Sequence, residues 1–278
     1  MFLAQLRNEL LKLFGKKRTY IGFGVFILAQ AGMMLLFRYG HVQDQLRRLL
    51  SGGGYRVEDY ISALTAAMFM LIPQIALLMP LYATLVGGDI VAKESEDGTL
   101  RMILSRPISR FRLLLVKWSA GIVFAIVLVL VLGATALAAA SLLFPWKAMI
   151  VVSPGRMFSV LSSGEGLSRY MFSHLFLAMN AGAVVSVAFM FSCFNMKPAA
   201  ATILALSYLL VSMVMENLQF FSSYDDWFIT HHFKCWQLVF QNPIPWGQIV
   251  HSEIILVALS VAVFVIGYLV FRARDIKS

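Results

Sequence analysis

Long uncharged stretches alternate with short charged ones along this chain. Six stretches lack Asp, Glu, Lys and Arg: residues 19–37, 60–88, 118–146, 170–196, 198–215 and 254–271. A helix needs about 20 apolar residues to cross the hydrocarbon core of a bilayer, and every stretch reaches or approaches that length. Their apolar runs are continuous, whereas a membrane β-barrel shows short segments of alternating polarity. The pattern predicts an all-α integral membrane protein with six transmembrane helices, organised as a single domain over residues 1–278.

The residues before the first apolar stretch follow an amphipathic pattern. Apolar side chains recur at helical spacing at Leu3, Leu6, Leu10 and Phe14. Polar side chains occupy the opposite side of the same helix at Gln5, Asn8, Glu9 and Lys12. Residues 1–18 are therefore expected to form an in-plane helix at the membrane surface, with its apolar side in lipid. The alternative is that this segment simply prolongs the first transmembrane helix.

Charge supports the membrane assignment and orients it. Only 13% of the residues are charged, against about 25% in soluble domains. With six spans, one side of the membrane holds segments 1–18, 89–117, 197 and 272–278. These segments contain 15 Lys and Arg against 6 Asp and Glu, while the other side has 8 of each. The positive-inside rule therefore predicts that both termini are cytoplasmic, and it explains the basic charge without nucleic-acid binding.

Three segments are then expected on the external side: residues 38–59, 147–169 and 218–249. The second of these is short, polar and rich in Ser and Gly. The third holds nine aromatic residues and is too interrupted to span, so it predicts interfacial or partly re-entrant helices. Within the spans, Pro73 and Pro80 predict kinks in the second helix, and Asn195 to Pro198 predict a tight hairpin between the fourth and fifth.

Candidate chemistry is sparse. His231, His232 and Cys235 are close in sequence and of the types that bind zinc or copper, but a fourth ligand is not evident. An interfacial aromatic belt is the favoured interpretation, and no metal or cofactor is expected. Glu253, near a predicted outer end, is a functional candidate because ionisable groups at the membrane boundary often are; a carboxylate reaching outer water is the alternative. The sequence contains no P-loop motif for binding ATP phosphates.

The most informative segment is residues 89–117, DIVAKESEDGTLRMILSRPISRFRLLLVK. Apolar residues interleave with charges of both signs, and breaks at Gly98 and Pro107 predict two short amphipathic helices. Gly98 is expected to adopt a positive φ, and Thr99 to cap a helix that starts near Leu100. Glu94 is expected to pair either with a basic group of a partner or with Arg101. A segment of this kind exposes a mixed surface to a soluble protein.

These residues resemble the permease subunits of ABC transporters of the ABC-2 type. The matching elements are the E-x-x-x-G-T pattern of Glu94, Gly98 and Thr99 and the run from Leu104 to Arg110. The in-plane amino-terminal arm, the six spans, the aromatic segment 218–249 and the basic carboxyl-terminal end are similar as well. The likeness covers the layout of the whole chain, although only the motif within residues 89–117 is specific.

The resemblance implies a non-catalytic permease that forms the path of an ATP-driven exporter in the bacterial inner membrane. It implies a second permease copy, a homodimer by preference, and two copies of a cytoplasmic ATPase subunit that binds ATP and magnesium. The implied ATPase-coupling residues are Glu94, Gly98, Thr99, Leu100, Arg101, Pro107 and Arg110. Two alternatives remain at this point: a non-transporting scaffold or sensor coupled to an ATPase, and a membrane-embedded metal-dependent enzyme using His231, His232 or Glu253.

Overall fold

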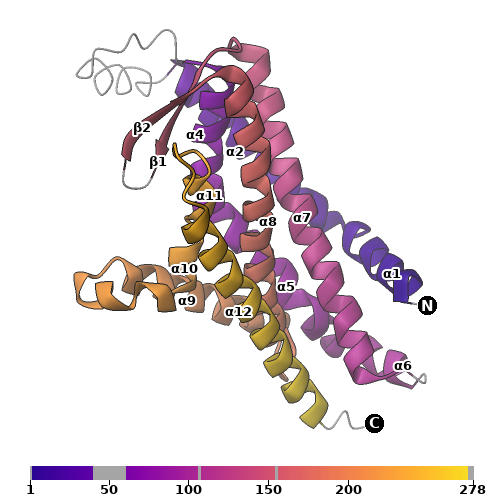
Figure 1. Ribbon diagram of the computed structural model, residues 1–278. Helices are drawn as coiled ribbons and strands as arrows, with labels where there is room; N and C mark the ends of the chain where they lie inside the picture. Colours follow the sequence, from indigo (N-terminus) through magenta and orange to yellow (C-terminus); the bar gives the residue numbers. More distant parts are fainter. Residues whose placement is uncertain (1, 40–60, 106–107, 154–155, 275–278) are drawn as a thin grey trace.

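A computed structural model describes residues 2–39, 61–105, 108–153 and 156–274, and most of this chain is helical (Figure 1). Six helical segments are long and apolar enough to cross a membrane. They are α2 (Lys17–Tyr39), α4–η2–α5 (Ala63–Glu96), α7 (Arg110–Leu143), α8 (Ser163–Ser192), α9 (Pro198–Glu216) and α12 (Trp246–Ala273). The structure confirms the class predicted from the uncharged stretches, a multi-pass all-α membrane protein.

The amino-terminal segment is a separate helix, α1 (Phe2–Phe14), rather than an extension of α2. The chain turns at Gly15, whose amide donates to the carbonyl of Leu11 at 2.8 Å. The two sides of α1 differ from the expectation, because polar Gln5 and Glu9 face α7 instead of pointing away from the protein. Leu3 and Leu11 are 77% and 62% exposed. The inward side of α1 is thus mixed rather than apolar.

The second span contains a wider helical turn between its two prolines. Helix α4 (Ala63–Pro73) passes into η2 (Gln74–Leu78), a π-helical turn, and then into α5 (Met79–Glu96). Pro80 has no amide hydrogen to donate, and its ring clashes with the carbonyl of the preceding turn in a regular α-helix. The π-helical turn changes the backbone hydrogen bonding at the place where the sequence predicted a kink.

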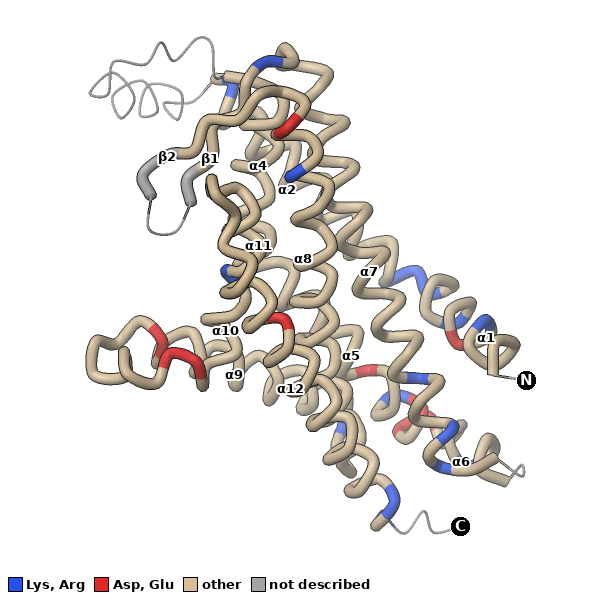
Figure 2. The backbone as a smooth tube through the Cα atoms, viewed as in Figure 1, with Lys and Arg blue, Asp and Glu red and all other residues tan. Residues whose placement is uncertain are grey.

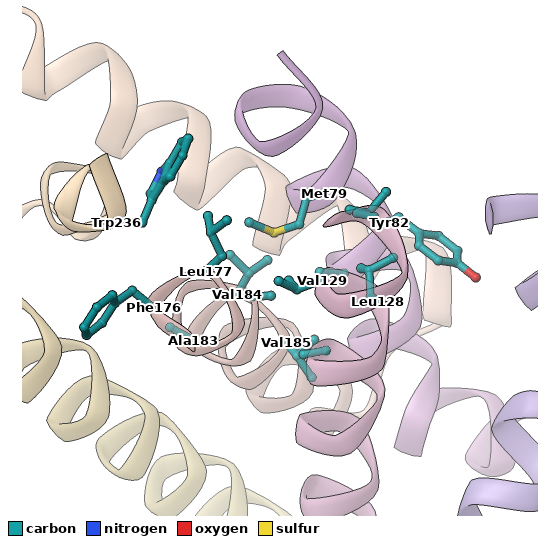
Figure 3. Packing of buried hydrophobic residues seen from close by; sticks show 14 of the residues in the cluster. Met79, Tyr82, Leu128, Val129, Phe176, Leu177, Ala183, Val184, Val185 and Trp236 are labelled. Atoms are coloured by element: carbon teal, nitrogen blue, oxygen red, sulfur yellow. The ribbon is translucent and has the colours of Figure 1, made fainter. Parts of the chain in front are cut away.

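Helix α8 lies at the centre of the bundle, packed between α5, α7 and α12. Figure 3 shows Val184 and Val185 of α8 beside Leu128 and Val129 of α7, and all four are buried. Gly87 of α5 permits a close approach, since a Cβ there would lie 2.8 Å from the carbonyl oxygen of Val185. Within a bilayer such contacts stabilise helix association through close packing, because lipid chains are as apolar as the side chains.

The connection between α7 and α8 contains a β-hairpin, whereas the sequence indicated only a polar segment. Strands β1 (Met149–Ser153) and β2 (Arg156–Leu161) pair antiparallel, with Met149 opposite Leu161. The amide of Ile150 donates to the hydroxyl of Thr65 at 3.1 Å, which fixes the hairpin to α4. Helix α8 begins at Ser163, seven residues before the uncharged stretch that starts at residue 170. The uncharged stretch does not include these seven residues because the first turns of the helix carry charged side chains.

The aromatic segment after α9 folds into three short helices, as its interrupted pattern predicted. They are η3 (Gln219–Trp227), α10 (Ile229–His232) and α11 (Cys235–Leu238). His232, Cys235 and Trp236 are each at most 2% exposed. Their burial contradicts the interfacial-belt interpretation for these three residues. Phe220 and Trp227 of the same segment are 85% and 83% exposed, so an interfacial belt stays a prediction for them.

Between α5 and α7 lies one short helix, α6 (Thr99–Leu104), instead of the two predicted for residues 89–117. The flanking spans account for the rest of the segment, since α5 continues to Glu96 and α7 starts at Arg110. Helices α1 and α6 and the end of α12 lie toward the same end of the bundle, which we call the terminal end (Figure 1). Many of the charged residues gather there, as Figure 2 shows.

Candidate functional site

Four charged side chains from three helices meet at the terminal end. Lys117 of α7 places its Nζ 2.9 Å from Oε2 of Glu9 in α1 and 2.7 Å from Oε2 of Glu94 in α5. Lys12 of α1 places its Nζ 2.9 Å from Oε1 of Glu9 and 3.3 Å from Oε1 of Glu94. Each carboxylate therefore contacts both ammonium groups. We call Glu9, Lys12, Glu94 and Lys117 the charge cluster.

Burial makes the charge cluster energetically important. The Lys117 side chain has no exposed surface, and those of Glu9 and Glu94 are 15% and 17% exposed. A buried ammonium is tolerated only when anions and hydrogen bonds replace its lost hydration. Burial acts to raise the pKa of the Glu9 carboxyl, but Lys117 and Lys12 outweigh it and hold that pKa below its usual value. The cluster thus ties α1 and α5 to α7 through charge.

The charge cluster borders a cleft of about 990 Å³ at the terminal end. Its walls come from α1, the end of α5, α6 and the start of α7. Charges of both signs lie beside apolar side chains in this lining, including Lys93, Asp97, Met102, Ile103 and Ile108. Met102 projects from α6 and is 65% exposed. The cleft therefore offers a mixed surface, as the sequence of residues 89–117 predicted, with α1 as a second wall.

A glycine turn sets the position of α6 relative to α5. Gly98 has a φ of 72°, which confirms the expected left-handed conformation. Thr99 does not cap the helix as expected; its hydroxyl instead donates to the carbonyl of Glu94 at 3.3 Å. Leu100 is 2% exposed and anchors α6 to the core. The left-handed conformation of Gly98, the hydroxyl of Thr99 and the buried side chain of Leu100 together hold this turn in place.

The structure also changes the expected role of Glu94. Its carboxylate contacts Lys117 and Lys12 inside the protein, and it does not pair with Arg101. Arg101 lies exposed on α6. Of the other residues implied in coupling, Pro107 lies outside the described part of the chain. The inward contacts of Glu94 make it a link between helices rather than a surface group awaiting a partner.

Two arginines fasten the carboxyl-terminal end of α12 to the same region. Arg110 donates through Nη1 to the carbonyls of Phe271, Arg272 and Arg274 at 2.9 to 3.2 Å. A cation at this position also complements the negative end of the helix dipole. Arg274 donates to the carbonyl of Cys193, Oδ1 of Asn195 and Oγ of Ser95. Arg110, implied in coupling by the sequence, is thus a helix cap in the structure.

The sequence pattern does not indicate the charge cluster as a unit. It predicts Glu9 and Lys12 on the polar side of the amino-terminal helix and Lys117 at the end of segment 89–117. Glu9 and Lys117 are 108 positions apart, so no local pattern joins them. The available signal was the position of Lys117 directly before a long uncharged stretch, where a helix continues into the bilayer.

The histidines and cysteine of the aromatic segment hold short helices in place. His232 lies 3.2 Å from Oγ of Ser252 through Nδ1 and 3.0 Å from the carbonyl of Asp226 through Nε2. Burial holds the pKa of His232 below its usual value. The thiol of Cys235 donates to Oε1 of Glu253 at 3.1 Å. Across the described residues, no three His, Cys, Asp or Glu side chains are arranged to bind a metal ion.

Comparison with known proteins finds two matches that extend over nearly the whole bundle. A family described as a protein of unknown function, DUF2705, matches residues 20–277. An uncharacterized protein of Bacillus subtilis strain 168, YhcI, is 23% identical over 314 residues, and the match covers 98% of each chain.

Proposed function

We propose that this chain, which belongs to the DUF2705 family, is the permease subunit of an ATP-driven exporter of the ABC-2 type. The observation that carries the proposal is the construction of the terminal end. A short helix with exposed side chains, α6, connects two candidate spans, α5 and α7, and lines the cleft. Buried ion pairs join these two spans to each other and to α1. The terminal end faces the cytoplasm in this proposal, in keeping with the basic charge of its segments.

Contacts within the protein give a route by which movement of α6 reaches the spans. Gly98 and the hydroxyl of Thr99 connect α6 to the backbone of α5 at Glu94. The Glu94 side chain then contacts Lys117 of α7, and Lys117 contacts Glu9 of α1. Because the helices are rigid and these charges are buried, a displacement of α6 shifts α5, α7 and α1 together.

The proposed partner is a cytoplasmic ATPase subunit that binds ATP and magnesium and seats on α6 and the cleft. Arg101 and Met102, both exposed on α6, offer a cation and a flexible apolar side chain to it. Two copies of the permease related by a two-fold axis would present two such surfaces, one to each of two ATPase subunits. Closure of the ATPase pair around ATP would then move both α6 helices.

The docking surface is tested by photocrosslinking in whole cells from position 105, which directly follows α6 and is exposed, followed by mass spectrometry of the captured protein. The proposal expects capture of a protein with a P-loop, and expects the purified complex to hydrolyse ATP. Arg101→Glu combined with Met102→Asp should abolish both. Arg272→Glu is the matched control, because Arg272 is exposed at the terminal end but lies on α12. Capture of the same ATPase by the doubly substituted chain would contradict the proposal.

Orientation is tested separately by cysteine labelling with an impermeant reagent. Ser162 is the N-cap residue of α8 at the far end of the bundle, and Ser105 follows α6; both are exposed. The two native cysteines are buried. A cysteine at position 162 should react from outside intact cells and one at position 105 only after lysis. The reverse pattern would place the terminal end outside and refute a cytoplasmic docking surface.

A further inference from the structure

A second groove, separate from the cleft, opens on the side of the bundle between α2, α5 and α9. Its volume is about 730 Å³. Apolar side chains with 37% to 66% of their surface exposed line most of its length, namely Ile21, Val25, Leu81, Leu85 and Ile203. Phe26 and Tyr82, which are at most 6% exposed, lie deeper among the lining residues. The lining helices are all candidate spans, so the occupant of this part must be stable in hydrocarbon.

The groove has a charged mouth at the terminal end. Arg18 pairs with Asp89 there, and Lys93 lies 2.8 Å from Oε2 of Glu96. Lys197, which is exposed, has no ion pair among the residues that the structure describes. It also occupies the N-cap position of α9, where the helix dipole adds a partial positive charge. The groove thus has an apolar length and, at its mouth, a cation without an ion pair in the described part of the chain.

We propose that this groove binds an anionic phospholipid. Its acyl chain lies against Ile21, Leu81 and Ile203, and its phosphate lies at Lys197 and the amino-terminal end of α9. Only an amphiphile satisfies both parts, because a fully apolar occupant leaves the mouth unfilled and a soluble anion leaves the apolar length empty. The lining holds three basic and two acidic residues, a balance of +1, which favours a headgroup of net negative charge.

Tyr82 shows how the deep part of the groove is built. Its hydroxyl donates to the carbonyl of Thr19 at 2.7 Å, and Gly22 allows the ring to lie flat against α2. A Cβ at Gly22 would lie 2.2 Å from the ring. The Tyr82 ring of α5 is therefore held against α2, and it fixes one wall of the apolar length of the groove. This site rests on the groove itself and does not depend on the proposed transport function.

The test measures which lipids remain bound after purification. The full chain is reconstituted in nanodiscs of phosphatidylethanolamine and phosphatidylglycerol at 3:1, extracted into mild detergent and analysed by native mass spectrometry. We expect one retained phospholipid, enriched in phosphatidylglycerol over its share of the mixture. Lys197→Gln should lower the ratio of retained phosphatidylglycerol to retained phosphatidylethanolamine about fivefold, the effect of one basic contact. Ile203→Trp should fill the groove and remove retained lipid of both kinds.

Two control variants match these substitutions elsewhere on the protein. Arg272→Gln removes an exposed cation at the same end, and Leu269→Trp enlarges an apolar side chain that is 54% exposed on α12. Both should retain lipid like the unsubstituted chain. Equal lipid retention in all five proteins would overturn the proposal. If a groove variant aggregates, the test uses the unsubstituted chain alone and measures competition between the two lipids. Equal retention of phosphatidylglycerol and phosphatidylethanolamine, in proportion to the mixture, would refute the assignment.

Two further outcomes would name a different occupant. Displacement of the retained lipid by millimolar inorganic phosphate would show a simple anion site that has no need of an acyl chain. Disulfide formation between two chains carrying Ile203→Cys would place a second copy of the protein in the groove. Either result would replace the phospholipid assignment, whereas failure of ATPase capture at α6 would leave it standing.

Discussion

Replacing Lys117 with methionine should destabilise this protein more than any other loss of a single charge at the terminal end. Methionine preserves most of the unbranched side chain and removes the ammonium group. Glu9 and Glu94 would then face each other with only Lys12 beside them, and the Lys12 side chain is 50% exposed. Removing one member of a buried ion pair costs about 3–5 kcal/mol, because the remaining charge is left without compensation.

Companion variants separate charge from packing. Glu9→Gln or Glu94→Gln alone leaves Lys117 with one carboxylate, so each should cost about 1.5–3 kcal/mol, the range for a hydrogen bond to a charged group. The triple variant Lys117→Met with Glu9→Gln and Glu94→Gln removes the network as a whole. Neutral replacement of an entire buried ion pair is often tolerated. The triple variant should therefore be more stable than Lys117→Met alone.

The measurement is equilibrium unfolding in mixed micelles, driven by dodecyl sulfate and followed by tryptophan fluorescence. Lys93→Met provides the matched control, because Lys93 also pairs with a glutamate, Glu96, and the two side chains are 39% and 40% exposed. Water screens such an exposed pair, so its loss should cost little. The reasoning fails if Lys117→Met costs no more than Lys93→Met. It also fails if the triple variant is as unstable as Lys117→Met, since packing rather than charge would then account for the loss.

Three other perturbations test separate features by the same unfolding assay. Gly98→Ala should cost about 1 kcal/mol from backbone conformation alone, because a Cβ there meets nothing within 4 Å, and Gly98→Asn should cost less; equal costs would contradict this. The pKa of Glu9 is lowered on folding, so its contribution is complete above its usual 4.5 and is lost as pH falls through the lower folded value. Glu9→Gln should reduce the acid sensitivity of stability, and an unchanged pH profile would refute that role. Gly133→Ala should cost about 1–3 kcal/mol, because its Cβ would lie 1.9 Å from Nε2 of His174, whereas Gly24→Ala, with nothing within 4 Å, should not destabilise.

The sequence predicted elements whose cause is local. The uncharged stretches located the six candidate spans found among the described residues, because crossing hydrocarbon constrains every residue of a segment. The left-handed turn at Gly98 was predictable because glycine adopts positive φ without a steric penalty. The β-hairpin had a signal in the run Met149 to Val152, rich in β-branched side chains, but its brevity and polar surroundings favoured a loop.

What the sequence did not show depends on tertiary contacts. Glu94 had two expected partners, and the structure gave it Lys117 and Lys12 instead. Those pairings require α1, α5 and α7 to converge, which no local pattern encodes. Composition favours an interfacial aromatic belt for His232 and Cys235, whereas their burial follows from how α10 and α11 pack on neighbouring helices. Sequence patterns therefore identify the helices, but they do not predict how the helices pack together.

The π-helical turn at Gln74–Leu78 also bears on the rotational phase of everything that follows it in the second span. Each residue of an α-helix advances the side chains by about 100° around the axis and by about 1.5 Å along it. A π-helical turn holds one residue more than an α-helical turn, so it takes up an extra residue with little rotation of α5 relative to α4. Deleting a residue from the regular helix beyond the turn would instead rotate the rest of α5 by the full step. Glu94, about four turns beyond the π-helical turn, would then swing away from Lys117, although no residue of the charge cluster had changed. The wider turn thereby lets the second span hold an extra residue in mid-membrane while its carboxylate at the end of the bundle stays in line with the cation.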